Sequence, residues 1–233
     1  MRKFTKLVVA FTLMGFTVGA CNEAKKNPDG DSSEQTEMDS DSSNMEETKG
    51  MESTTVLNAN LATEEDLNGI GLSSELVTAI LEQRPFLDMD AFNSILGTKT
   101  NKSELYTKIF VPLNLNTTAE ADFKMVPGVG DRMAHEFEEY RPYESIKQFR
   151  REIGKYVDEA EVARYENYVF VPVELNSASE EDIKALPGVG NRMAHEFEEY
   201  RPYANMEQFR KEIGKYVDEK ELSRLERFVY LKE

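Results

Sequence analysis

Apolar residues recur at helical spacing in the part of the chain that follows residue 130. The positions that share this spacing are Met133, Ala134, Phe137 and Tyr140. Met133, Phe137 and Tyr140 fall three or four residues apart, and Ala134 falls three residues before Phe137, which predicts a helix with one buried face. Pro142 predicts the end of this helix, because the residue before a proline disfavours helical geometry. The same spacing predicts a further helix with Ile146, Phe149 and Ile153, and another, after Asp158, with Val162, Tyr165 and Val169.

This pattern returns 60 residues later, so the chain contains internal repeats. The segment from Met133 to Tyr143 recurs without change from Met193 to Tyr203. A diverged copy lies upstream and begins at Leu57-Asn58-Ala59-Asn60. We therefore expect an all-α fold of three tandem modules, which cover residues 55–110, 111–170 and 171–233.

Each copy opens with a predicted helix start and a glycine turn. Thr63 and Ser179 precede acidic first turns, as helix N-caps commonly do. Ala119 occupies this position in copy two, so its first helix should lose about 1 kcal/mol unless one of the two preceding threonines replaces the cap. That helix should stop at Pro127-Gly128-Val129-Gly130, where glycine permits the positive φ of a tight turn.

The N-terminal region has the features of an export signal. Three basic residues precede the apolar stretch 7–18, which has the length of a signal-peptide core and is too short to span a membrane. The stretch ends in Val18-Gly19-Ala20-Cys21, which resembles a bacterial lipobox. The resemblance implies a lipoprotein signal peptide at 1–20, cleavage before Cys21 and lipid attachment to that cysteine. The alternative is an uncleaved signal anchor. We expect an exported protein held to a membrane of the cell envelope, on the periplasmic or the cell-surface side.

Residues 21–54 differ from the repeats in composition. After the cysteine this segment contains 10 acidic and 3 basic residues and almost no large apolar side chains. Such a sequence cannot bury enough surface to offset its ordering entropy. We therefore predict a disordered acidic linker, extended by its own charge repulsion, that acts as a spacer.

Charge narrows the functional classes. The formal net charge is −16, and copies two and three carry 12 acids with 8 bases and 14 acids with 10 bases. Nucleic-acid-binding domains are usually basic. The helix after the hairpin is itself acidic, and we expect Glu136, Glu138 and Glu139 on its solvent face. Bases cluster locally, and form either a positive strip or a face that neutralises its own acids; they are Lys147, Arg150, Arg151, Lys155, Arg210, Lys211 and Lys215.

The order of residues in copy three resembles the helix-hairpin-helix module of ComEA-like competence proteins. The residues that carry the resemblance are Asn176, Ser179, Ile183, Leu186, Pro187-Gly188-Val189-Gly190 and Ala194. The resemblance covers about residues 55 to 233. In ComEA-like proteins the glycine hairpin binds the DNA backbone. Free backbone N–H groups and the helix dipole attract a phosphate, and such contacts read no base sequence.

The resemblance implies two binding hairpins and one module without this chemistry. The implied DNA-binding residues are Gly128, Val129, Gly130 and Arg132 in copy two and Gly188, Val189, Gly190 and Arg192 in copy three. The glycines and valines would present N–H groups, and the arginines would supply positive charge. Copy one has Ser73 in place of the second glycine and Glu75 in place of the arginine, so we expect it to be a structural end cap of the array.

Two kinds of partner remain open. One is the backbone of double-stranded DNA, bound weakly and without sequence preference, as in DNA uptake during competence. The other is an envelope protein, because the same fold serves in envelope and secretion proteins without DNA binding and an acidic surface suits a protein partner.

The sequence contains no pattern that predicts an enzyme. His135 with Glu139, and His195 with Glu199, are spaced four residues apart on the solvent side of a helix. Each pair supplies two ligands, which is fewer than a metal site needs. We therefore predict a non-enzymatic protein without a cofactor or a metal.

Overall fold

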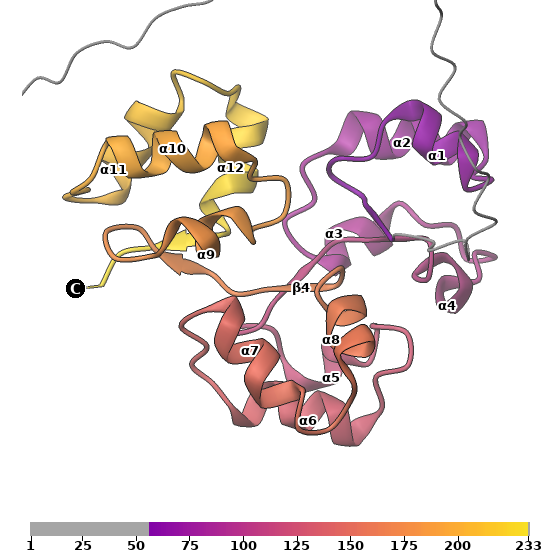
Figure 1. Ribbon diagram of the computed structural model, residues 1–233. Coiled ribbons are helices and arrows are strands. Elements are labelled where there is room, and N and C mark those ends of the chain that lie inside the picture. The colour runs from indigo at the N-terminus through magenta and orange to yellow at the C-terminus, as the bar shows by residue number, and fades with distance from the viewer. Residues whose placement is uncertain (1–55, 233) are drawn as a thin grey trace, which may run out of the picture. The chain divides into compact units, whose positions relative to one another are not determined.

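The computed structural model describes residues 56–232. The predicted signal peptide, the predicted lipidation site Cys21 and the predicted acidic linker lie outside the described residues. Within them, a group of four helices enclosed by a pair of short strands occurs three times along the chain (Figure 1). We call these groups module 1 (residues 57–110), module 2 (113–170) and module 3 (173–230). The fold is all-α with tandem helical modules, as the repeats predicted.

The helices and strands of the three modules follow the same order. Module 1 contains β1 (Leu57–Asn58), α1 (Glu64–Gly69), α2 (Ser74–Gln83), α3 (Met89–Ser94), α4 (Lys102–Leu105) and β2 (Ile109–Phe110). Module 2 contains β3 (Leu113–Asn114), α5 (Glu120–Phe123), α6 (Asp131–Glu139), α7 (Ile146–Ile153), α8 (Glu159–Tyr165) and β4 (Val169–Phe170). Module 3 contains β5 (Val173–Glu174), α9 (Glu180–Lys184), α10 (Asn191–Glu199), α11 (Met206–Ile213), α12 (Glu219–Glu226) and β6 (Val229–Tyr230).

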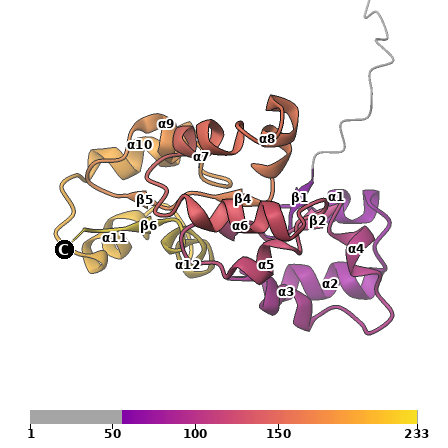
Figure 2. The ribbon, with the colours of Figure 1, turned by 90° about the horizontal axis from the view of Figure 1, so that it is seen from below.

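The first and last strands of each module pair in parallel and close the module. Leu57 pairs with Ile109 in module 1, and the other two modules repeat this register. Figure 2 shows β5 and β6 side by side. The sequence pattern did not predict these strands, because two residues are too few to show alternation. The assignment of Val169 to the fourth helix was therefore wrong: α8 ends at Tyr165, and Val169 lies in β4.

The helix starts agree with the predicted caps. The Thr63 side chain accepts a hydrogen bond from the Asp66 N–H and forms a full capping box with Asp66. The Ser179 side chain caps α9 by accepting a hydrogen bond from the Asp182 N–H. Ala119 provides no side-chain cap for α5, and neither preceding threonine replaces it. The weaker start predicted for the first helix of module 2 is therefore present.

In each module an asparagine that follows the first strand binds the backbone of the segment between the second and third helices. In module 2 the Asn116 side chain donates to the Tyr143 carbonyl at 2.8 Å and accepts from the Tyr143 N–H at 2.7 Å. Asn176 makes the same pair of bonds with Tyr203 at 3.0 and 2.7 Å. Asn60 does so in module 1 with the backbone of Phe86. We call this arrangement the asparagine clasp. It gives the Asn of the sequence motif a structural role.

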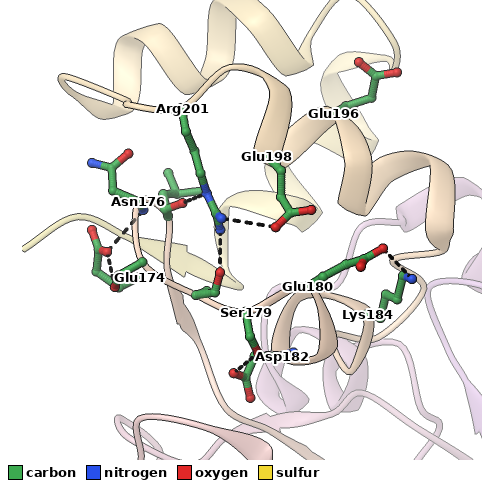
Figure 3. A network of polar contacts seen from close by, with 12 residues as sticks. Glu174, Asn176, Ser179, Glu180, Asp182, Lys184, Glu196, Glu198 and Arg201 are labelled. Carbon is green, nitrogen blue, oxygen red and sulfur yellow. Dashed lines mark hydrogen bonds and ion pairs between the residues drawn. The ribbon is translucent and has the colours of Figure 1, made fainter. Parts of the chain in front are cut away.

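An arginine fastens the same loop from the other side. Arg201 donates to the carbonyls of Leu175 and Ala178 at 2.6 and 2.8 Å, and it pairs with Glu198 at 3.2 Å (Figure 3). Arg141 in module 2 and Arg84 in module 1 hold the corresponding loops. These arginines are thus occupied inside their modules. Clasp and arginine together fix the path of the chain into the helix before the glycine turn.

Aromatic side chains fill the core and join successive modules. In module 2 the buried ring of Phe137 packs edge-on against Phe123 and Tyr165, each at 5.3 Å between ring centroids. Phe110, at the end of module 1, packs against Tyr168 of module 2 with ring centroids 5.0 Å apart. Phe170, at the end of module 2, packs in the same way against Phe228 of module 3 at 4.7 Å. Edge-to-face pairs contribute about 0.5–1.5 kcal/mol beyond their burial. No helix within residues 56–232 is long and apolar enough to cross a membrane.

Candidate nucleic-acid interface

The glycine turn of modules 2 and 3 joins two helices at a sharp corner. Gly128 has a φ of +81° and Gly188 a φ of +73°, a conformation that side chains with a Cβ rarely adopt. The Val129 N–H donates to the Val126 carbonyl at 3.0 Å, and Val189 repeats this bond with Leu186. The turn is therefore fastened by its own backbone before any ligand is considered.

This bond corrects one expected role. Val129 and Val189 do not present free N–H groups, because each donates inside its own turn, and both side chains are buried. The N–H groups of Gly128 and Gly130 have no acceptor within residues 56–232, and no side chain caps α6 at Gly130. The open donors of the hairpin are thus these glycines and the first turn of α6, whose N–H groups have no partner inside the helix.

An arginine of the fourth helix supports each turn from behind. Arg164 on α8 donates to the Pro127 carbonyl at 2.7 Å and pairs with Glu161 at 2.6 Å. Arg224 on α12 does the same with the Pro187 carbonyl at 2.5 Å. The pairing with Glu161 raises the pKa of Arg164 above its usual value. Counted back from the last strand, Glu104 takes this place in module 1. The sequence analysis missed this support, because the arginine lies 37 residues beyond the turn that it holds.

Two exposed arginines follow the turns. Arg132 and Arg192 both lie on the first turn of their helices and form no ion pair within residues 56–232. The Arg132 guanidinium lies 5.7 Å from the centre of the Tyr156 ring, within the range of a cation–π contact. These side chains can reach an anion at the hairpin without first breaking a bond to a carboxylate.

Module 2 carries a carboxylate at the hairpin that module 3 lacks. Asp131, the first residue of α6, forms an ion pair with Lys124. The hydrogen bond from Lys124 lowers the pKa of Asp131, and the same bond raises the pKa of Lys124. Module 3 has Asn191 at this position, and there Lys184 pairs instead with Glu180 at 2.6 Å. Asp131 was not among the residues expected to matter, although it is the one difference between segments 127–143 and 187–203.

The other clustered bases do not form a free positive strip. Arg150 pairs with Glu166 through two hydrogen bonds of 2.7 and 2.8 Å, and Arg151 and Lys155 both pair with Glu152. Module 3 repeats these pairs through Arg210, Lys211 and Lys215. Within residues 56–232, six of the seven clustered bases are paired with acids and Lys147 is the exception. These pairs support the second alternative, a face that neutralises its own acids.

One acidic residue of α6 lies elsewhere than expected. Glu138 and Glu139 are exposed, but Glu136 is only 9% exposed. It follows Met133 by three residues and precedes Tyr140 by four, so it lies at the edge of the apolar stripe. Its Oε2 atom has no hydrogen-bond partner within residues 56–232. The Tyr140 hydroxyl, followed by the Glu136 carboxylate, raises the pKa of the Tyr156 hydroxyl.

Module 1 has the same glycine turn but lacks the second glycine and the arginine of the other two hairpins. Gly71 has a φ of +79°, so the corner itself is present. Ser73 caps α2 and its hydroxyl accepts from the Leu76 N–H at 3.4 Å, a donor that is open in the other modules. Glu75 places a negative charge where they have an arginine. An anion at this hairpin would meet a capped helix end and a carboxylate.

The histidines are exposed, as the helical spacing predicted. His135 lies 3.3 Å from Glu120 and 4.0 Å from Glu139, and the hydrogen bond to Glu120 raises the pKa of His135. His195 approaches Glu199 at 3.7 Å. Among the residues that the structure describes, no three His, Cys, Asp or Glu side chains are grouped as a metal site would require.

Comparison with known families agrees with the geometry of module 3. Residues 169–230 match the family model described as the helix-hairpin-helix motif. This segment of the chain is therefore a helix-hairpin-helix module. Module 2 has the same order of elements and the same glycine turn. No curated protein and no solved structure matched the chain.

Proposed function

We propose that this chain binds the backbone of double-stranded DNA weakly and without sequence preference, through the hairpins of modules 2 and 3. The observation that carries the proposal is the helix start after each glycine turn, which has no side-chain cap, with an arginine on its first turn that forms no ion pair within residues 56–232. Helix-hairpin-helix motifs commonly bind nucleic acids. Backbone N–H groups and a helix N-terminus suit a phosphate oxygen, which has no base identity.

The expected affinity is low. Each hairpin contacts few phosphates, and non-specific binding falls at about 10⁻⁴ to 10⁻⁶ M at physiological salt. The net charge of −4 in module 2, from 8 bases and 12 acids, adds repulsion rather than attraction. Two hairpins on one chain gain affinity when both reach the same duplex. Weak, salt-sensitive binding suits a protein that holds DNA temporarily.

We further propose that the chain is a ComEA-like envelope lipoprotein. The lipobox-like ending at Cys21 supports a lipid anchor, and the acidic linker supports a spacer between the membrane and the modules. The resemblance to competence proteins supports a role in DNA uptake. No enzymatic activity is part of the proposal.

The competing function is a protein-interaction module of the envelope. It is favoured by the neutralised face of α7, where Arg150, Arg151 and Lys155 all pair with carboxylates instead of remaining free for DNA. The partner is then an envelope protein, and the glycine turn is a compact corner.

Titration of a fluorescent duplex with the full-length protein in mild detergent separates these functions. We expect the logarithm of the binding constant to fall linearly with the logarithm of the salt concentration. The binding constant should be equal for two duplexes of unrelated sequence. The combined variant Arg132→Glu and Arg192→Glu should lose most of the binding. Absence of binding at low salt would refute the DNA proposal and favour the protein partner.

A matched control separates local chemistry from overall charge. Lys147 is exposed on α7 and forms no ion pair within residues 56–232, and module 3 carries Glu207 at the same position. Lys147→Glu therefore makes the same charge change as Arg132→Glu at a site that tolerates it, and we expect little loss of affinity. Asp131→Asn copies module 3 and should raise affinity, since it removes a carboxylate from the hairpin.

A further inference from the structure

The hairpin of module 2 forms one wall of a groove that it shares with module 1. The groove has a volume of about 820 Å³. Its module 2 wall runs from Lys124 to Gly130 and includes the two glycines with open N–H groups. The opposite wall comes from module 1, and its residues are Asn93, Lys102, Ser103 and Tyr106. Module 1 thus lies beside a binding hairpin although its own hairpin has lost the binding residues.

Lys102 is the uncompensated charge of this groove. Two charged side chains line it, Lys102 and Lys124, and both are basic. Lys124 is neutralised by its ion pair with Asp131. Lys102 is exposed at the start of α4 and forms no ion pair with any residue from 56 to 232. The nearby Glu104 is itself paired with Lys108 at 3.1 Å. A phosphate in the groove therefore meets glycine N–H groups on one side and a free ammonium group on the other.

The hairpin of module 3 has different surroundings. A Cβ atom on Gly188 would lie 2.6 Å from the Leu61 side chain of module 1, so Leu61 rests against this turn. The arginine that supports this turn is also less accessible than its counterpart in module 2. The Arg224 side chain is 2% exposed, whereas the Arg164 side chain is 32% exposed. Both arginines hold the same partners in their own modules. Leu61 of module 1 and the Arg224 guanidinium both lie beside Gly188, so module 1 contributes to this cover.

Two further contacts hold module 3 against module 1. Arg227 donates to the Phe86 carbonyl of module 1 at 3.5 Å and to the Pro112 carbonyl, between modules 1 and 2, at 3.0 Å. Its guanidinium lies over the rings of Phe170 and Phe228. Burial lowers the pKa of Arg227 to about 10. Lys220 donates to the Glu82 carbonyl at 3.4 Å. Module 2 has Asn167 where module 3 has Arg227, so this tie is specific to module 3.

From these contacts we propose that the main DNA site of the intact chain is the groove between modules 1 and 2, where Lys102 contacts a backbone phosphate. The hairpin of module 3 contributes less, because Leu61 lies against its glycine turn. This inference rests on the proposed DNA binding. It gives module 1 a part in binding, in addition to the structural role expected from its sequence.

The test compares two lysines of module 1 in the full-length protein. Removal of one phosphate contact lowers the salt slope by about 0.9, which corresponds to about a fivefold loss of affinity at 0.15 M salt. We expect this loss for Lys102→Gln. Lys99→Gln removes the same charge from an exposed lysine outside the groove and should leave both affinity and slope unchanged. Equal effects of the two variants would overturn the role of Lys102.

Single charge reversals test the inequality of the hairpins. We expect Arg132→Glu to weaken binding more than Arg192→Glu, and the variant Leu61→Ala to increase the effect of Arg192→Glu. A loss with Arg192→Glu that equals or exceeds the loss with Arg132→Glu would overturn the inference. If binding depends on Arg132 but not on Lys102, the shared groove fails and the proposed function stands. If the unaltered protein binds no duplex at low salt, the proposed function itself fails.

Discussion

Replacement of Asn116 by alanine tests the clasp that positions the hairpin of module 2. The Asn116 side chain makes two hydrogen bonds to the Tyr143 backbone, at 2.8 and 2.7 Å. Each bond contributes about 0.5–1.5 kcal/mol, and a buried backbone group left without a partner costs about 1–3 kcal/mol. The Tyr143 ring is fully buried, so water cannot easily replace the amide. We expect Asn116→Ala to lower the free energy of unfolding by about 2–4 kcal/mol.

Urea unfolding followed by circular dichroism measures this loss, and the chain offers a matched control. The Asn167 amide also donates to two carbonyls, those of Ala163 and Arg164, at 3.2 and 3.1 Å, but both lie within its own turn. We expect Asn167→Ala to cost less than about 1 kcal/mol, because these bonds are local and partly exposed. A cost for Asn116→Ala below that of the control would refute the clasp as the element that holds the loop.

Four further substitutions follow from local geometry. Ala119→Ser restores the missing cap of α5 and should raise the midpoint of urea unfolding, by about 1 kcal/mol in free energy; no increase would contradict the capping argument. Gly128→Ala should lower the free energy of unfolding by about 1–2 kcal/mol, because φ is +81° there. A side chain at position 130 has room, so Gly130→Ser should stabilise α6 while it weakens DNA binding. Because the bond to Glu120 raises the pKa of His135, this pair stabilises the fold below the ordinary histidine pKa of 6.5, and the contribution disappears as the pH rises through the raised pKa. Glu120→Gln should therefore destabilise the protein at pH 5.5 and have little effect at pH 8.5.

The hydrophobic spacing and the caps were sufficient to predict the helices. The apolar positions of α7, Ile146, Phe149 and Ile153, are all buried, and Thr63 and Ser179 cap helices as expected. These features are local, since they depend on residues within one or two turns. The strands escaped prediction because their partners lie more than fifty residues away and each strand is two residues long.

The chemistry of the hairpin was predictable only in part. The positive φ of Gly128 follows from the Pro-Gly-Val-Gly turn, but the bond that occupies the Val129 N–H depends on how the turn closes. The support from Arg164 and the burial of Glu136 depend on tertiary packing. The groove beside Lys102 requires two modules to lie together, which no local pattern encodes.

The claim that hairpin amides hold a phosphate is tested most directly by an NMR titration with a short duplex. We predict that the amide resonances of Gly128 and Gly130 shift as the duplex is added, and that higher salt reverses the shifts. Gly71 provides an internal control, because it has the same positive φ in a hairpin that lacks the arginine. Its amide should not move. Shifts that are absent at Gly128 and Gly130, or equally large at Gly71, would contradict the account.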